Sequence, residues 1–417
     1  MMADVAMMPD APVVPEVPAS AEAPARRYTL GSGLLGDALA TLMAGRASGN
    51  QALFDEAARL LREAGAAAGR HRELDRGLFT GADGFAWVLA CFGETDPAYR
   101  AALEVMTDQL TAAEPEPLPH GAPARRWDLI SGYAGQLACL LRLRRAAAGG
   151  RLRAVEERAR QLTRQLVRRP GGGAPGLGLL YVATDHKRAP GWYRGMYPHG
   201  HYPLGMAHGA AGVVSVLAAA AADGLADEET MTFIDRCLDD LLGVAVSRPG
   251  GAVWHAAAGA AGAAGKPVIS VKHTVPSAWC KGTAGVAAAL AAGGAVTGRR
   301  DVVRFAVSAV AEDARGWQGR TDLGLCHGTS GLAVISGWIA RFAEPPEAGR
   351  LLRARAALLR DVGTGASREP GLLCGVHGEK LALLGDRGGG DSAGWGDSAG
   401  WGDSGGWGGW GRLLGLA

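Results

Sequence analysis

The sequence has few of the features that would assign it to a common class. Its 417 residues include six cysteines, spaced too widely for the disulfide framework of a small secreted protein. There are 43 basic and 41 acidic residues, so the formal charge of +2 provides no general attraction to nucleic acid or membranes. The chain shows neither a basic, apolar signal segment at its start nor an 18-residue uncharged apolar span. We therefore expect a soluble, cytoplasmic protein.

Low-complexity sequence marks both ends of the chain. Residues 1–27 are rich in Ala, Pro, Val and Glu without a period, which predicts a disordered N-terminal segment. Residues 387–417 are dominated by a Gly-Asp-Ser-Ala-Gly-Trp repeat and then by Gly and Trp, which predicts a flexible tail. The segment between them, 28–386, should form the folded domain.

A G-x-x-G motif recurs seven times between these ends. The seven motifs begin at Gly33, Gly81, Gly132, Gly209, Gly282, Gly328 and Gly375. They are 48, 51, 77, 73, 46 and 47 residues apart, so the two long intervals resemble the same unit with inserts of about 25–30 residues. Most motifs open a run that is apolar almost all round, and charged amphipathic stretches lie between these runs.

A unit of about 47 residues suits one buried helix followed by one outer helix. Seven such pairs could stack into an open solenoid or close into a ring, and the very apolar inner helices favour closure. We attribute the glycines to seven helix N-termini crowding around one axis, where glycine allows close approach with free φ. The predicted fold is all-α, an α,α-toroid of seven helical pairs with the G-x-x-G turns at one mouth.

Soft metal ligands precede two neighbouring motifs. Cys280 stands two residues before the fifth motif, and Cys326 and His327 directly precede the sixth. Two sulfurs and one imidazole are a usual zinc ligand set, and three protein ligands leave the fourth position open, as in catalytic sites. Buried structural thiols are the alternative. Cys374, before the seventh motif, is either a fourth ligand that would close the site or a packed thiol.

Other polar side chains should collect at the same mouth if the units are equivalent. His208 precedes the fourth motif as a candidate general acid or base, or as a core histidine bonded to a carbonyl. Asp128, four residues before the third motif, could orient that histidine or only cap a helix. Lys281 could lower a thiol pKa or stabilise an enolate oxygen, or remain solvated. Tyr202 and His201 could line the mouth as substrate-binding residues, or belong to an insert without a role.

The motifs Trp-Cys280-x-Gly, Cys326-His327-Gly, Ala-His208-Gly and Asp128-x-x-x-Gly resemble those of the lanthionine synthetase C-like family, the lanthipeptide cyclases. The resemblance implies a seven-fold α,α-toroid with one catalytic zinc ion on the two cysteines and His327. The implied reaction adds cysteine thiols to dehydroalanine or dehydrobutyrine and closes thioether rings during antibiotic biosynthesis. The family's acid-base residues correspond to His208 and Asp128.

The resemblance covers about residues 28–386, which we expect to be one cyclase domain, and it has one clear departure. Such cyclases carry an arginine four residues before the first zinc cysteine, where this chain has Pro276. Lys281 is the first candidate to replace that arginine and His273 the second.

The implied substrate is a dehydrated precursor peptide, and a separate dehydratase and a transporter are the candidate partner proteins. One alternative is an enzyme on the same scaffold that adds glutathione or another thiol to dehydrated residues. Another is a non-catalytic scaffold in which zinc ties two repeats together and the mouth binds a partner enzyme. A glycosidase is disfavoured because no paired carboxylates stand at the turns. A prenyltransferase can also hold zinc for a thiol, so only substrate tests separate it.

Overall fold

The computed structural model describes residues 28–70, 75–168, 176–185, 191–248, 251–260, 275–317, 320–364 and 371–387. The predicted disordered segment 1–27 lies outside these residues, as does all but the first residue of the predicted tail 387–417. His273 also lies outside them.

Seven helices each begin at the residue after the first glycine of a G-x-x-G motif. They are α1 (Leu34–Ser48), α3 (Ala82–Thr95), α5 (Tyr133–Leu143), α8 (Ala210–Ala222), α10 (Thr283–Thr297), α12 (Thr329–Ile339) and α14 (Val376–Arg387). Helices α5, α8, α10 and α12 are buried on nearly every side, as the absence of a polar face predicts. These seven are the inner helices.

Six outer helices follow the first six inner helices along the chain. They are α2 (Gln51–Ala68), α4 (Arg100–Ala112), α6 (Gly149–Val167), α9 (Glu228–Gly243), α11 (Arg300–Asp313) and α13 (Pro345–Thr364). Each packs on the inner helix that precedes it, and α6, for example, buries Val155, Ala159 and Leu162 together with the charged Arg158. Within the described ranges, α14 is not followed by an outer helix, so the structure shows six of the seven predicted pairs and the seventh inner helix.

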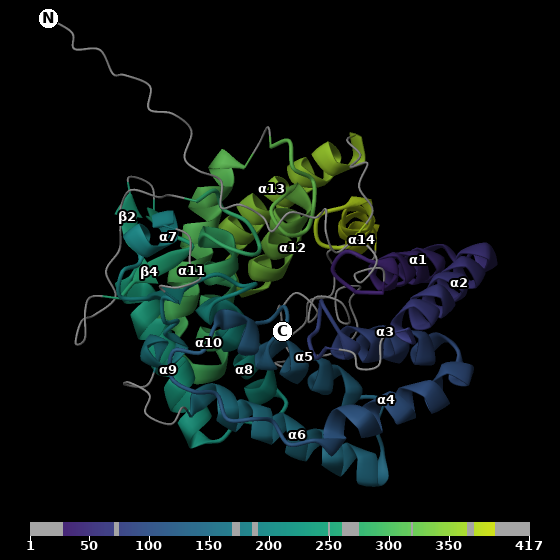
Figure 1. The fold of residues 1–417 in the computed structure, drawn as a ribbon. Coiled ribbons are helices and arrows are strands. Elements are labelled where there is room, and N and C mark those ends of the chain that lie inside the picture. The colour runs from purple at the N-terminus through teal and green to yellow at the C-terminus, as the bar shows by residue number, and fades with distance from the viewer. Residues whose placement is uncertain are drawn as a thin grey trace, which may run out of the picture.

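The inner helices form a closed ring rather than an open solenoid. Each contacts the next in chain order, and α14 packs against α1, so the first and last units lie side by side (Figure 1). The predicted α,α-toroid is therefore confirmed. Closure leaves no unpaired terminal repeat, because every inner helix has an inner neighbour on both sides.

The same steric contact explains why the last residue of every motif around the ring is a glycine. A Cβ on Gly331 would lie 2.0 Å from the carbonyl oxygen of Leu325, which is three residues before the first glycine of the same motif. The side chain of Trp279, at the equivalent place in the preceding motif, approaches the same point to 3.1 Å. Equivalent contacts of 2.0–2.5 Å occur at the second glycine of all seven motifs. Close approach therefore explains these glycines.

We expected the first glycines to use the φ values that only glycine adopts freely, and most of them do not. Gly33, Gly81 and Gly209 have extended backbones with φ between −128° and −151°, and Gly282 is the one first glycine that is left-handed, with φ of +79°. Close approach is again the constraint, because a Cβ on Gly81 would meet the carbonyl of Asp75 at 1.9 Å.

Aromatic side chains fill the axis below the turns. Trp279 is fully buried and packs edge-on against Phe79, with ring centroids 6.1 Å apart, although their motifs are the fifth and the second. The ring is therefore a packed core rather than a channel, and the chemistry must lie above it, at the mouth where the turns meet.

The inserts form small additional elements beside the ring. They comprise α7 (Gly191–Met196), β1 (His201–Pro203), β2 (Val246–Arg248), β3 (Gly251–Val253) and β4 (Ala257–Gly259). Strands β1 and β4 pair antiparallel, as do β2 and β3. In the part of the chain that the structure describes, no helix has the length and apolar character needed to cross a bilayer.

Candidate functional site

The turns that precede the inner helices are held in register by backbone hydrogen bonds. The N–H groups of Gly31, Phe79, Leu129, Ala207, Cys280, Cys326 and Leu373 donate, respectively, to the carbonyls of Phe79, Ile130, Ala207, Cys280, Cys326, Leu373 and Gly31, over 2.7–3.3 Å. These bonds form a circuit that closes on itself, and they place the residue two before each first glycine next to its counterpart in the neighbouring turn. Cys280 and Cys326 hold adjacent places in this circuit.

The circuit also brings two other positions of neighbouring turns into contact. The residue four positions before one motif lies against the residue that directly precedes the next motif. A Cβ on Gly77 would lie 2.8 Å from the backbone of Ser131, and one on Gly324 would lie 3.1 Å from that of Cys374. In the third turn this position is Asp128, and the residue directly before the next motif is His208. The fold thus places the side chains of Asp128 and His208 together, at a position where other pairs of turns bring a glycine against backbone atoms.

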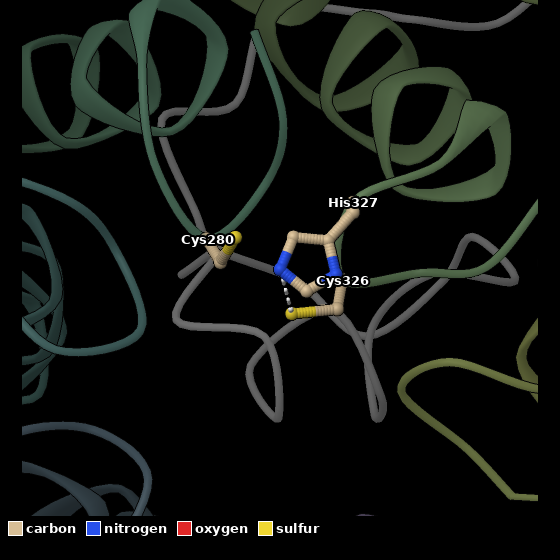
Figure 2. A group of neighbouring side chains, drawn as sticks. All are labelled: Cys280, Cys326 and His327. Atoms are coloured by element: carbon tan, nitrogen blue, oxygen red, sulfur yellow. Dashed lines mark hydrogen bonds between the residues drawn. The ribbon is translucent and has the colours of Figure 1, made fainter. Parts of the chain in front are cut away.

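The two cysteines and His327 form one compact group. The sulfur atoms of Cys280 and Cys326 and a ring nitrogen of His327 all lie within 4.8 Å of one another, and Figure 2 shows the three side chains gathered from two neighbouring turns. The Cys326 sulfur is 3.7 Å from Nε2 of His327. Both cysteines are 8% exposed, whereas His327 is half-buried. Three donor atoms clustered in this way could hold a metal ion.

The donor set fits zinc in chemistry and in spacing. Zn–S bonds of about 2.3 Å and Zn–N bonds of about 2.0 Å place the donors of a tetrahedral site about 3.5–3.8 Å apart. The 3.7 Å between Cys326 and His327 matches that value. Soft thiolates with an imidazole select zinc over the hard, oxygen-preferring cations.

The ionisation of these side chains also suits a bound cation. Hydrogen bonds from Cys326, opposed by burial and supported by His327, lower the pKa of Cys280 to about 5. Interactions with Cys280 and Cys374 raise the pKa of His327 to about 10. The group therefore keeps thiolate charge in a buried place, and a metal ion that replaces the shared protons would neutralise it.

His208 and Asp128 form a hydrogen bond across neighbouring turns. Nδ1 of His208 lies 2.6 Å from Oδ2 of the fully buried Asp128. The other carboxylate oxygen accepts the backbone N–H groups of Ser131 and Gly132 at 2.8 and 3.0 Å. One carboxylate oxygen of Asp128 therefore holds the turn, and the other contacts the imidazole. With Nδ1 engaged, Nε2 is the atom that faces proton exchange.

The surroundings of His208 favour its protonated form. Burial opposes that charge, but the hydrogen bond and the negative charge of Asp128, with a smaller effect from Cys280, raise the pKa of His208 above its ordinary 6.5. The side chain remains 63% exposed at the mouth. An imidazole whose pKa is raised and that is open to the mouth can deliver a proton there.

Lys281 and Arg320 bring positive charge to the same turns. Lys281 is half-buried, and its charge is one of the influences that lower the pKa of Cys280. The guanidinium of Arg320 donates from one nitrogen to the carbonyl of Ser277 at 2.6 Å and to that of His327 at 3.4 Å. Arg320 thus joins the turn of Cys280 to the turn of His327. Sequence reasoning missed it, because its spacing from the motifs is shared by no other functional residue.

Tyr202 and His201 lie in the insert that leads to His208. They belong to strand β1, where Tyr202 is half-buried and tilted against Tyr181, with ring centroids 5.8 Å apart. His201 is 8% exposed and stacks on Tyr197, and burial lowers its pKa to about 4. Tyr202 therefore has surface to offer a ligand, and the neutral His201 has little.

Comparisons with known proteins identify the family of the chain and match its fold. Residues 24–385 match the family described as Lanthionine synthetase C-like protein. Thirteen chains of solved structures match the fold. One of them, nisin cyclase, superposes with a TM-score of 0.72 at 18% sequence identity, over 94% of this chain and 93% of its own. A search of curated proteins gave no significant match.

Proposed function

Because the chain belongs to the lanthionine synthetase C-like family, we propose that it is a zinc-dependent lanthipeptide cyclase. Its reaction would add cysteine thiols of a dehydrated peptide to dehydroalanine or dehydrobutyrine in the same peptide, forming lanthionine and methyllanthionine rings. One observation carries the proposal: a soft-ligand group and an acid-base pair occupy neighbouring turns of the same circuit. The solved nisin cyclase structure supports the fold of this proposal, and its name suggests the reaction.

The metal would be held by Cys280, Cys326 and His327, which leaves one coordination position for a substrate thiol. Zinc bound there would ionise and hold the substrate thiol, whose ordinary pKa of about 8.5 leaves little thiolate at neutral pH. Two cysteine sulfurs in the ligand set keep electron density on the metal, so the held sulfur stays nucleophilic. Trp279, the chain neighbour of Cys280, is fully buried below the turns.

Residues of the protein would then supply the proton that the α-carbon needs. The thiol sulfur attacks the β-carbon of the dehydrated residue, a C–S bond forms, and the π electrons move to an enolate. The α-carbon must gain a proton, and His208 would donate it from Nε2 while Asp128 holds Nδ1. The thiol loses one proton and the α-carbon gains one, so peptide mass does not change. A single fixed donor would protonate one face and set one configuration.

Of the two cations at these turns, only Lys281 would stabilise the enolate oxygen. Lys281 comes from the turn of the first zinc cysteine, and we assign it that role in place of the arginine that family members carry at the position of Pro276. Arg320 is a positioning residue in this scheme, since its hydrogen bonds go to two turn carbonyls. Tyr202 would contact the peptide at the edge of the mouth.

The wider setting belongs to the same proposal. One cyclase domain would span residues 28–386, and the protein would act in the cytoplasm on a peptide already dehydrated by a separate dehydratase. A transporter that exports the finished peptide would be a further partner.

The test is a thiol count on a dehydrated, cysteine-containing peptide. Incubation with the zinc-loaded chain should leave peptide mass unchanged while alkylation with N-ethylmaleimide falls by one adduct per ring. The Cys326→Ala variant should leave every thiol reactive. If the wild type binds zinc and closes no ring but adds glutathione to the peptide, the intermolecular enzyme replaces this proposal. Bound zinc with neither reaction would favour the scaffold.

A further inference from the structure

The seventh turn brings a third cysteine to the candidate metal site. Cys374 directly precedes the seventh motif, the same place that His327 holds in the sixth. Its thiol contacts the side chains of both Cys326 and His327, and it is the only exposed cysteine among the six, all of which are described. The compact group within 4.8 Å comprises Cys280, Cys326 and His327, so Cys374 lies beside that group and is more exposed than any of its members.

The backbone of the seventh turn is held firmly at this place. The N–H of Cys326 donates to the carbonyl of Leu373 at 2.7 Å, the shortest bond in the circuit of turns. Gly324 permits the approach, since a Cβ there would lie 3.0 Å from the Leu373 oxygen and 3.1 Å from the Cα of Cys374. The third thiol is therefore positioned by the same contacts that position the second.

We propose that Cys374 is a displaceable ligand, which turns inward to fill the fourth coordination position of the metal and leaves when a substrate thiol binds. A permanent Cys₃His set would close the site, as in structural zinc centres, and would prevent catalysis. The other three ligands are buried or half-buried, whereas Cys374 is exposed. It is thus the ligand with room to depart. This inference rests on the proposed function.

The exchange balances in atoms and charge. The incoming R–SH forms a metal–sulfur bond, the bond to the Cys374 sulfur breaks, and the proton of the incoming thiol passes to Cys374. One thiolate replaces another, so the half-buried site gains no net charge and incurs no new cost of burying charge. When product leaves, Cys374 returns to the metal and releases the proton to solvent.

Cobalt substitution tests the ligand count without measuring activity. The sulfur-to-cobalt charge-transfer band grows with the number of thiolates, so the Co²⁺ form of the wild type should show three thiolates and Cys374→Ser two, a fall of about one third. Gly324→Ala should give the same fall with Cys374 intact, because its Cβ pushes the seventh turn away. Cys91→Ser, which removes a buried thiol bonded to Arg142, is the control and should keep the full band.

Displacement is tested by adding a small thiol such as 2-mercaptoethanol. In the wild type the band should stay constant as one thiolate replaces another, whereas in Cys374→Ser it should rise by about one half. Iodoacetamide should label Cys374 slowly in the zinc-loaded wild type and rapidly once the thiol is present.

Several results would overturn the inference while leaving the proposed function in place. Equal bands in the wild type and Cys374→Ser would do so, as would a Cys374 that is labelled equally fast with and without zinc. A chain that binds no cobalt or zinc at all would overturn the proposed function as well, so the two failures are distinguishable.

Discussion

Nδ1 of His208 lies 2.6 Å from Oδ2 of Asp128, although the two residues are 80 positions apart and belong to different turns of the ring. The backbone circuit brings these turns together, and the same relation between other turns involves glycine against backbone. The pair is therefore a local specialisation of a repeated contact. Its consequences can be tested separately from those of the metal ligands.

Replacing His208 should remove proton delivery and leave the metal in place. His208→Asn is expected to slow ring closure by about 100- to 10,000-fold, the usual range for loss of a general acid. Zinc content should stay at the wild-type value, and any product should be mixed in configuration at the α-carbon. Chiral analysis of hydrolysed product beside metal analysis makes the measurement. Full activity with one unchanged stereoisomer would remove His208 from the mechanism.

The pH profile should report the His208–Asp128 pair. Burial opposes the imidazolium, yet Asp128 raises the pKa of His208 above 6.5, so donation should decline as pH rises through this higher value. Asp128→Asn should move the decline to lower pH. Because the folded-state pKa is raised, the pair's contribution to the free energy of unfolding is complete below 6.5 and disappears as pH rises through the folded-state value. Rate profiles and urea titrations across this window check both shifts, and an unmoved decline in the variant argues against the pair.

Loss of one sulfur should abolish the metal site. Purified wild type is expected to contain about one zinc per chain by mass spectrometry, as three protein ligands converge on one point. Cys326→Ala should contain almost none. Cys237→Ala, which changes a fully buried thiol on an outer helix, is the matched control and should retain zinc. Zinc-free wild type from metal-replete growth would exclude thiol activation by zinc.

Arg320 should matter for metal affinity through the turns that it joins. Arg320→Gln removes both hydrogen bonds to the turn carbonyls and should weaken zinc binding about 10- to 100-fold, as loss of a supporting partner does at other metal sites. Arg320→Lys should recover part of the loss. Chelator competition provides the affinities, and Arg315→Gln, which breaks only an exposed ion pair, serves as control. Equal affinities in all variants would leave Arg320 with a purely structural role.

The second glycine of each motif should be intolerant of any side chain. In Gly331→Ala the new Cβ would lie 2.0 Å from the carbonyl of Leu325, so the turn or helix α12 must move. We expect a loss of about 3 kcal/mol or more in the free energy of unfolding, in the range typical of severe steric conflicts. Gly150→Ala has open space around the new atom within helix α6 and should be neutral or stabilising by about 0.5–1 kcal/mol. Urea unfolding measures both.

Much of the fold was predictable from spacing. Seven G-x-x-G motifs at near-regular intervals, each opening an apolar run, predict seven inner helices, and all seven begin where expected. The ligand group was also predictable, because Cys280 and Cys326 hold the same place relative to their motifs. Equivalent residues of neighbouring units must meet when a ring closes. Such positions depend only on periodicity.

The sequence left other contacts undecided between alternatives, and it gave no sign of Arg320. The contact between Asp128 and His208 depends on an offset of three positions between neighbouring turns, and the contact of Cys374 with His327 depends on the order of the turns around the axis. Arg320 reaches its two carbonyls from a connecting segment without a repeat pattern. A repeated unit predicts what its members share, and these residues differ from their counterparts.

The sequence by itself therefore determined the helical units, their number and the chemical identity of the donors at the turns. Those properties follow from local periodicity and side-chain chemistry. Only the tertiary structure decided which donors face one another, because closing the circuit of seven turns sets the distance and order of residues from different units. Hydrogen bonds between backbones at Cys280, Cys326 and Leu373 convert a repeated pattern along the chain into one asymmetric site.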